Sequence, residues 1–276
     1  MRLPPFSLHV EVWLLFGSIV AAYLIACSRH ERDTGEATPV RRKRFFLIGI
    51  GVLFVGASWP IHDLAEGYLY SVHMVQHMLF TLVAPPLLIA GAPAWLMRRL
   101  LRPTWVARMF RFVTMPIVAL ILFNGALLFV HWPAVVTLSV TSGWAHFGLH
   151  VLLVFTALAM WWPVMSTLPE YPALSPPGQM IYLFFQSLAP TIPASFLTFG
   201  DHPLYHVYVT FPRIWGIGAL DDQMIAGLIM KLIGGAILWG FIATIFFRWY
   251  AREHDQDWDA SRYRDVEHDV RAGLSR

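Results

Sequence analysis

Seven long apolar stretches, separated by short polar segments, dominate the chain. Each has about the 20 residues that a helix needs to cross the hydrocarbon core of a bilayer. The pattern predicts an all-α, polytopic membrane protein in which residues 1–250 form a seven-helix transmembrane domain and residues 251–276 a charged tail. The predicted spans are approximately residues 9–27, 45–64, 71–91, 114–132, 143–165, 179–199 and 223–247.

The composition agrees with a membrane protein, because 57% of the 276 residues are hydrophobic and 13% are charged, against about 25% charged in soluble domains. A single cysteine, Cys27, excludes an internal disulfide and Cys-x-x-Cys motifs. We find no phosphate-binding glycine loop, nucleophile elbow or pair of carboxylates within the spans. The sequence therefore predicts a binding protein that catalyses no reaction.

The positive charges predict the orientation. Six of the 20 lysines and arginines follow the first stretch, five follow the third, and six lie at or beyond residue 248. Short cytoplasmic loops retain such residues, and with seven spans these three places share one side. We predict an outer N-terminus and a cytoplasmic C-terminus. Topology explains the cations, so we expect no nucleic acid as a partner.

The histidines gather on the opposite side. In this topology, nine of the 12 fall at outer span ends or in outer loops, several of them within hydrocarbon depth, where polar groups are costly. This distribution predicts a site at the outer membrane boundary. The nine are His9, His62, His73, His77, His131, His146, His150, His202 and His206.

The third span carries the strongest candidate ligands. His73 and His77 are four residues apart, so on a helix they share one face and can chelate one ion. Met74 and Met78 point about 100° away, and we expect them to pack. The adjacent prolines at 85–86 lack amide hydrogens and predict a kink just below the site.

The fifth span repeats this spacing. His146 and His150 lie at its outer start, and opposite the first pair they place four nitrogens at one depth. Such a set suits copper or zinc, and because imidazole is borderline in softness the spacing does not choose between them. The alternative, that these histidines only form hydrogen bonds between helices, stays open.

Three further residues are weaker candidates for the metal site. His131 ends the fourth span, and His62 is either a ligand with Asp63 as its acidic partner or part of an ordinary loop. Asp221 and Asp222 open the seventh span, where one carboxylate would cap that helix. We expect the other aspartate, which we take to be Asp222, to contact the metal.

Several other residues are open to more than one interpretation. We expect His202 and His206 to be interfacial, because Pro203 disturbs helical geometry between them. Lys231, about two turns into the seventh span, would snorkel, pair with a carboxylate or line a water-filled cavity.

Taken together, the motifs resemble the CtaG family of multi-span bacterial cytochrome c oxidase assembly factors. The resemblance rests on HMVQHML at 73–79, APPLL at 84–88, GAP at 91–93, WWP at 161–163 and DDQ at 221–223, followed by AGLIM at 226–230. It implies a protein of the bacterial cytoplasmic (inner) membrane that assembles a haem-copper oxidase and handles copper for it. Lys231 departs from the apolar or aromatic residue expected there.

Three functions remain in view. The first is an assembly factor that binds copper at a site facing the periplasm or cell exterior and passes it to a cytochrome c oxidase subunit, with membrane lipids as its other partners. The second is a copper permease, whose path the kinked third span and Lys231 would mark. The third is a haem-binding membrane cytochrome, which is disfavoured because a second histidine one turn away would crowd the porphyrin. The oligomeric state stays open.

Overall fold

A computed structural model describes the backbone of residues 4–274 and the side chains of residues 4–254. Every regular element within these residues is helical, which confirms the all-α prediction. In chain order the elements are α1 (Val10–Thr34), α2 (Val40–Gly56), α3 (Ile61–Gly67), α4 (Tyr70–Met78), the π-helical turn η1 (Leu79–Val83), α5 (Ala84–Gly91), α6 (Ala94–Leu100), α7 (Thr104–Val113), α8 (Pro116–Val130), α9 (Pro133–Thr141), α10 (Gly143–Met165), α11 (Pro176–Leu188), α12 (Thr191–Phe199), α13 (His206–Val209), α14 (Ala219–Leu228), the π-helical turn η2 (Ile229–Ile233) and α15 (Gly234–Leu274).

Six helical segments are long and apolar enough to cross a membrane, and the pair α7 and α8, bent by 76°, makes a seventh candidate. The second span joins α2 to α3, and the sixth joins α11 to α12. α8 matches the predicted fourth span, whereas α7 carries arginines beside exposed Trp105 and Phe112. Six to seven spans agree with the predicted polytopic fold.

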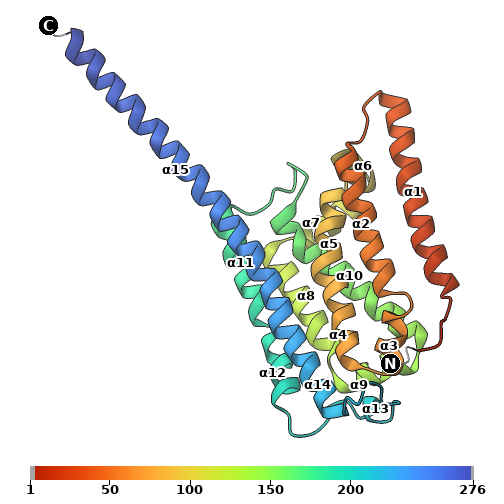
Figure 1. Cartoon of the computed structure of the whole chain (residues 1–276). Helices are drawn as coiled ribbons and strands as arrows, with labels where there is room; N and C mark the ends of the chain where they lie inside the picture. The colour runs from red at the N-terminus through yellow and green to blue at the C-terminus, as the bar shows by residue number, and fades with distance from the viewer. Residues whose placement is uncertain (1–3, 275–276) are drawn as a thin grey trace.

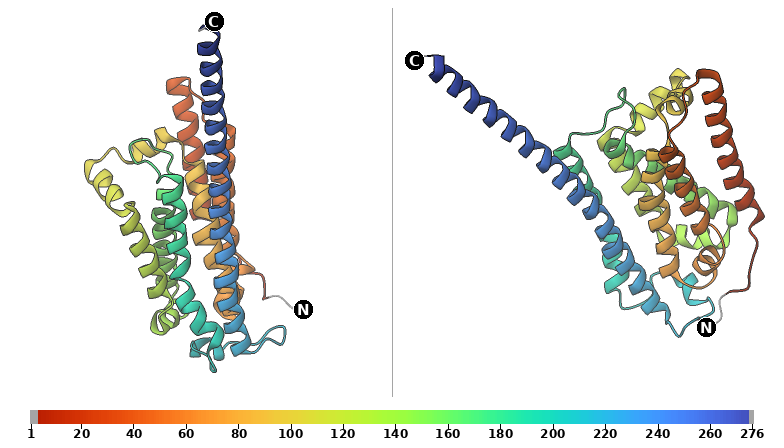
Figure 2. Two further views of the ribbon diagram at one scale, coloured as in Figure 1. Left: turned by 90° about the vertical axis from the view of Figure 1, so that its left-hand side faces the viewer. Right: turned by 45° about the horizontal axis from the view of Figure 1, so that its top comes forward.

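The two ends of the helical bundle differ in their residues. α1 begins at the end that also holds α3, α9 and α13 (Figure 1). The α1–α2 connection, α6 and α7 lie at the opposite end, and α15 continues past it in every view (Figures 1 and 2). The arginines of residues 98–111 therefore lie at one end, and the starts of α4 and α10, with their histidines, lie at the other.

The third span contains a π-helical turn next to its double proline. η1 ends at Val83, two residues before Pro85, and Pro85 and Pro86 are the second and third residues of α5. Pro85 has no amide hydrogen for the carbonyl of Thr81 four residues back. The indole Nε1 of Trp161 on α10 donates to that carbonyl instead, at 2.8 Å. This bond satisfies the freed carbonyl and joins the third span to the fifth.

The third span also packs tightly against the second. At Gly91 an added Cβ would lie 2.3 Å from the backbone nitrogen of Phe46, and at Gly49 it would lie 2.9 Å from the Leu88 side chain. Glycines let transmembrane helices approach this closely. The result is a rigid support for α4, on which two of the candidate ligands lie.

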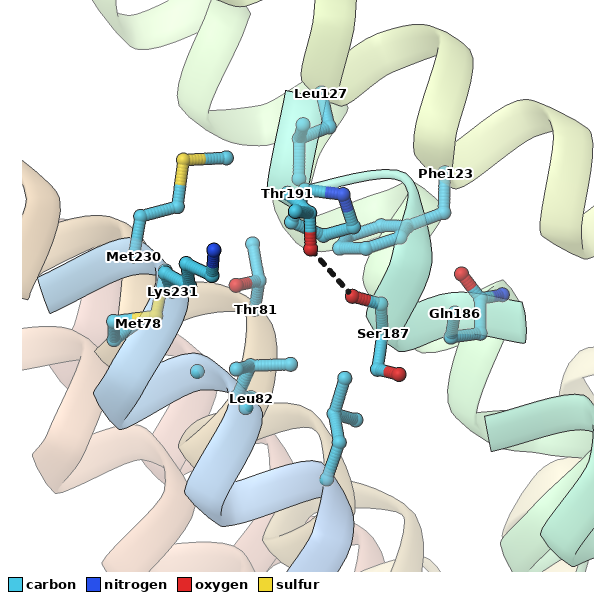
Figure 3. A pocket seen from close by; sticks show the side chains of 14 residues that line it. Met78, Thr81, Leu82, Phe123, Leu127, Gln186, Ser187, Thr191, Met230 and Lys231 are labelled. Carbon is cyan, nitrogen blue, oxygen red and sulfur yellow. Dashed lines mark hydrogen bonds between the residues drawn. The ribbon is translucent and has the colours of Figure 1, made fainter. Parts of the chain in front are cut away.

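Lys231 lies in the second π-helical turn, η2. Its side chain lines a small cavity of about 30 Å³ together with Met78 and Thr81 from the third span (Figure 3). The structure therefore places this lysine on a cavity wall one or more turns deeper than His77. Within the described side chains, its ammonium forms no ion pair.

Candidate metal centre

Three of the predicted ligands converge where α4 faces α10. One ring nitrogen from each of His73, His77 and His150 lies within 4.8 Å of the other two, and we call these residues the inner triad. Two ligands bound at about 2.1 Å to one ion lie at most about 4.2 Å apart, so small side-chain movements would close the set. The predicted contact between the third and fifth spans is confirmed.

The inner triad is largely buried and poor in hydrogen bonds. His73 and His77 are each only 6% exposed, and His150 is partly buried. Nδ1 of His73 and Nε2 of His150 are buried and make no hydrogen bond within the described part of the chain. Polar atoms left in this state are costly and uncommon. The donor set therefore fits a metal ion, which would use these lone pairs.

His131 lies beside the inner triad. Its ring centroid is 5.8 Å from that of His77. Nδ1 donates to the carbonyl of Leu127 at 2.7 Å, which leaves the buried Nε2 with no hydrogen-bond partner among the described residues. Metal-binding histidines commonly donate their other nitrogen in this way. His131 therefore lies next to the inner triad with one ring nitrogen unpartnered among the described residues.

The backbone of His131 is held by a tyrosine from the loop before α14. The hydroxyl of Tyr205 donates to the carbonyl of His131 at 2.8 Å. Burial raises the pKa of Tyr205 to about 12. The phenol therefore stays protonated and keeps donating throughout the physiological pH range.

A second set lies nearer the end of the bundle. His62, Glu66 and His146 also place ligand atoms within 4.8 Å of one another, and we call them the outer triad. The ring centroid of His146 is 4.0 Å from that of His150, so the two triads adjoin. Sequence reasoning missed Glu66, although it follows His62 by the same four residues as in the other pairs. The signal was overlooked because the segment was read as the end of a span, not as the helix α3.

The structure gives Asp63 a different partner from the one expected. Its carboxylate accepts hydrogen bonds from Ser7 and, at 3.0 Å, from the His9 ring, while Glu66 faces His62. Burial lowers the pKa of His9, but its hydrogen bonds and charge interactions with Asp63 and Glu11 outweigh this effect and the net pKa is raised. The expected pairing of His62 with Asp63 is therefore corrected. Asp63 instead attaches the segment before α1 to α3.

Asp222 also has another role from the one expected. Its side chain is fully buried, and its two oxygens accept hydrogen bonds from the amides of Tyr70 at 2.7 Å and Ser71 at 2.9 Å. The expectation that one of these aspartates caps its own helix is wrong, because α14 has no side-chain cap. Asp222 instead caps α4 and fixes the height of the inner triad, so both of its oxygens are engaged away from the metal position.

The other candidates lie where packing or solvent explains them. Met74 and Met78 are buried in the core, and His202 and His206 are exposed in the loop around α13. The structure thus brings together His62, His73, His77, His131, His146 and His150, and leaves out Asp222.

Comparison with known proteins identifies the chain's relatives. The sequence model of the family described as cytochrome c oxidase caa3 assembly factor matches residues 21–252, which include both triads. The chain belongs to this family. Membership confirms the resemblance stated above.

Two relatives of the chain come from mycobacteria. It is 26% identical over 168 residues to uncharacterized proteins of Mycobacterium bovis and Mycobacterium tuberculosis. The alignment covers 55% of this chain and 25% of each relative, so the chain corresponds to only a quarter of their length. No solved structure matches the chain.

Proposed function

We propose that this assembly factor binds copper through the inner triad, with His131 in reach as a fourth ligand, and passes the ion to a cytochrome c oxidase subunit. The observation that carries the proposal is the convergence of three imidazoles, two buried and one partly buried, from two facing helices. Two of their nitrogens lack any other partner among the described residues. Imidazole is a common ligand for copper. The role requires binding and release, and no catalysed reaction.

The charge of the inner triad favours a monovalent ion. All three ligands are neutral imidazoles in a buried site, and the free energy of burying an ion rises steeply with its charge. The nearby carboxylate of Asp222 already accepts two amide hydrogens. We therefore propose Cu(I) as the inner ion in preference to Zn²⁺.

Lys231 bears on the copper permease alternative. Lys231 is an exposed residue whose side chain lines a cavity together with Met78 and Thr81, which follow His77 along the third span (Figure 3). A positive charge at that depth repels a cation moving further into the bundle. This placement favours an ion that enters and leaves by the histidine end.

The close packing of the histidines bears on the haem alternative. The ring centroids of His73 and His77 are 4.4 Å apart, and that of His150 lies 5.9 Å from His73 and 5.8 Å from His77. A porphyrin bound to one of these rings would overlap its neighbours. The set therefore suits a bare ion better than haem.

The proposed location follows from the distribution of charge. The arginine-rich loops lie at the end of the bundle opposite the histidines, and cytoplasmic loops retain arginine. We place the inner triad at the outer face of the bacterial cytoplasmic membrane. Ions would reach it from the periplasm or the cell exterior.

Copper analysis of purified protein tests the proposal. The full chain in detergent is loaded anaerobically with Cu(I), and bound copper is measured for the wild type and for His73→Ala/His77→Ala. The matched control is His202→Ala/His206→Ala, which removes two exposed histidines of the same spacing at the same end of the bundle. We expect the control to keep its copper and the inner variant to lose most of it. His77→Gln, a smaller change, repeats the test if the double variant fails to fold.

Equal copper in the two double variants would contradict the proposal. A Soret band in the protein as purified would support the haem-binding alternative instead. Copper uptake into vesicles containing the purified protein would support the permease.

A further inference from the structure

The outer triad differs from the inner one in its donors and exposure. It combines two imidazoles with one carboxylate, and the side chains of His62, Glu66 and His146 are 18%, 31% and 6% exposed. α3 supplies two of these residues and α10 the third. The outer triad is thus a partly exposed, negatively charged set beside a buried, neutral one.

We propose that the outer triad is a second metal centre, which binds a divalent transition-metal ion such as Zn²⁺ through ligands separate from those of the inner triad. Two histidines and one glutamate form a well-known three-ligand set for Zn²⁺, which leaves one position for water. The partial exposure of Glu66 allows water to reach that position. The proposal goes beyond the copper site, because it concerns other residues and another ion.

The geometry already directs the three side chains to one point. Oε1 of Glu66 lies 2.8 Å from Nε2 of His146, and Oε2 lies 3.4 Å from Nε2 of His62. Nε2 of His146 is nevertheless buried without a hydrogen bond of acceptable geometry among the described side chains. The other nitrogen of that ring lies 3.1 Å from the hydroxyl of Ser139, which fixes its orientation. An imidazole nitrogen that faces a carboxylate, on a ring whose other nitrogen is held, is an arrangement that fits a metal ion bound between the two groups.

Charge explains why the two sites would take different ions. Glu66 offsets one of the two charges of a divalent ion, whereas the inner triad offers no such compensation. The rings of His146 and His150 are 4.0 Å apart, so ions in both sites would repel each other. We infer that zinc binds more weakly to the outer triad when the inner triad is occupied.

The proposed site also has a consequence for access. The outer triad lies between the inner triad and the aqueous end of the bundle, because His62 and Glu66 come from α3 and His146 lies one turn closer to the start of α10 than His150. An ion held there would obstruct exchange of the inner one. Zinc bound at the outer triad should therefore slow the loss of copper to a chelator.

Zinc binding by equilibrium dialysis tests the second centre. The full chain in detergent is compared with Glu66→Gln, which keeps the shape of the side chain and removes its charge. Glu11→Gln is the matched control, because Glu11 is an exposed carboxylate at the same end of the bundle. We expect Glu66→Gln to lower zinc affinity at least tenfold and the control to leave it unchanged.

A second comparison separates the two centres. The His73→Ala/His77→Ala variant lacks the inner triad and should still bind one Zn²⁺ per chain, and adding Glu66→Gln to it should abolish that binding. Unchanged zinc affinity in Glu66→Gln would overturn the proposal. No zinc binding by a folded His73→Ala/His77→Ala variant would also overturn it, since that result means a single shared site. If the inner triad proves not to bind copper, the zinc-binding results expected for the two Glu66→Gln variants are unchanged. The copper proposal and the zinc proposal can therefore be disproved separately.

Discussion

At the scale of the residue, Asp222 shows how a candidate ligand acquires another role. Sequence spacing correctly brought out the histidines, because residues four apart share a helix face whatever the fold. The partner of Asp222 is about 150 positions away, at the start of α4. No local pattern encodes such a contact. The role of this aspartate therefore required the assembled structure.

The cap on α4 can be tested by mutation. Asp222→Ala leaves the amides of Tyr70 and Ser71 without their acceptors in a buried place, so we expect it to lower the free energy of unfolding by about 3 kcal/mol. The neighbouring Asp221 is exposed, and Asp221→Ala is the control. Thermal unfolding in detergent measures both. Equal unfolding temperatures for the two variants would show that the cap contributes little.

At the scale of the element, the spans were largely predictable and their irregularities were not. Apolar runs of about 20 residues mark a crossing because lipid requires them. The π-helical turns η1 and η2, and the short helices α3, α9 and α13, result from contacts between spans that no single stretch of sequence reveals. The double proline did indicate a disturbance. Its form, a π-helical turn completed by Trp161, depends on a different span.

The close approach of α2 and α5 gives a prediction at this scale. Gly91→Ala places a Cβ against the backbone of Phe46, and relieving that clash should cost about 1–3 kcal/mol. Gly51 lies on α2, as Phe46 does, and an added Cβ there meets nothing within 4 Å. Gly51→Ala should therefore be neutral or slightly stabilising. Apparent melting temperatures in detergent compare the two. A melting temperature of Gly91→Ala equal to that of Gly51→Ala would contradict the packing described.

At the scale of the whole molecule, the predicted topology rests on the separation of arginines and histidines to opposite ends of the bundle. Cysteine labelling tests it in a background of Cys27→Ser, which removes the single, buried native cysteine. Thr210→Cys lies in the exposed loop at the histidine end, and Thr104→Cys lies exposed at the arginine end. A membrane-impermeant maleimide should label the first in intact cells and the second only after lysis. The reverse pattern would place the inner triad at the cytoplasmic face.

The central claim is that imidazoles of the inner triad hold the copper. X-ray absorption at the copper edge of the Cu(I)-loaded chain tests it most directly, because it reports the atoms bound to the ion. We predict a shell of three or four imidazole nitrogens, which is lost in the His73→Ala/His77→Ala variant and kept in His202→Ala/His206→Ala. A shell dominated by sulfur would instead assign the copper to Met74 or Met78, and a spectrum unchanged by loss of His73 and His77 would contradict the account.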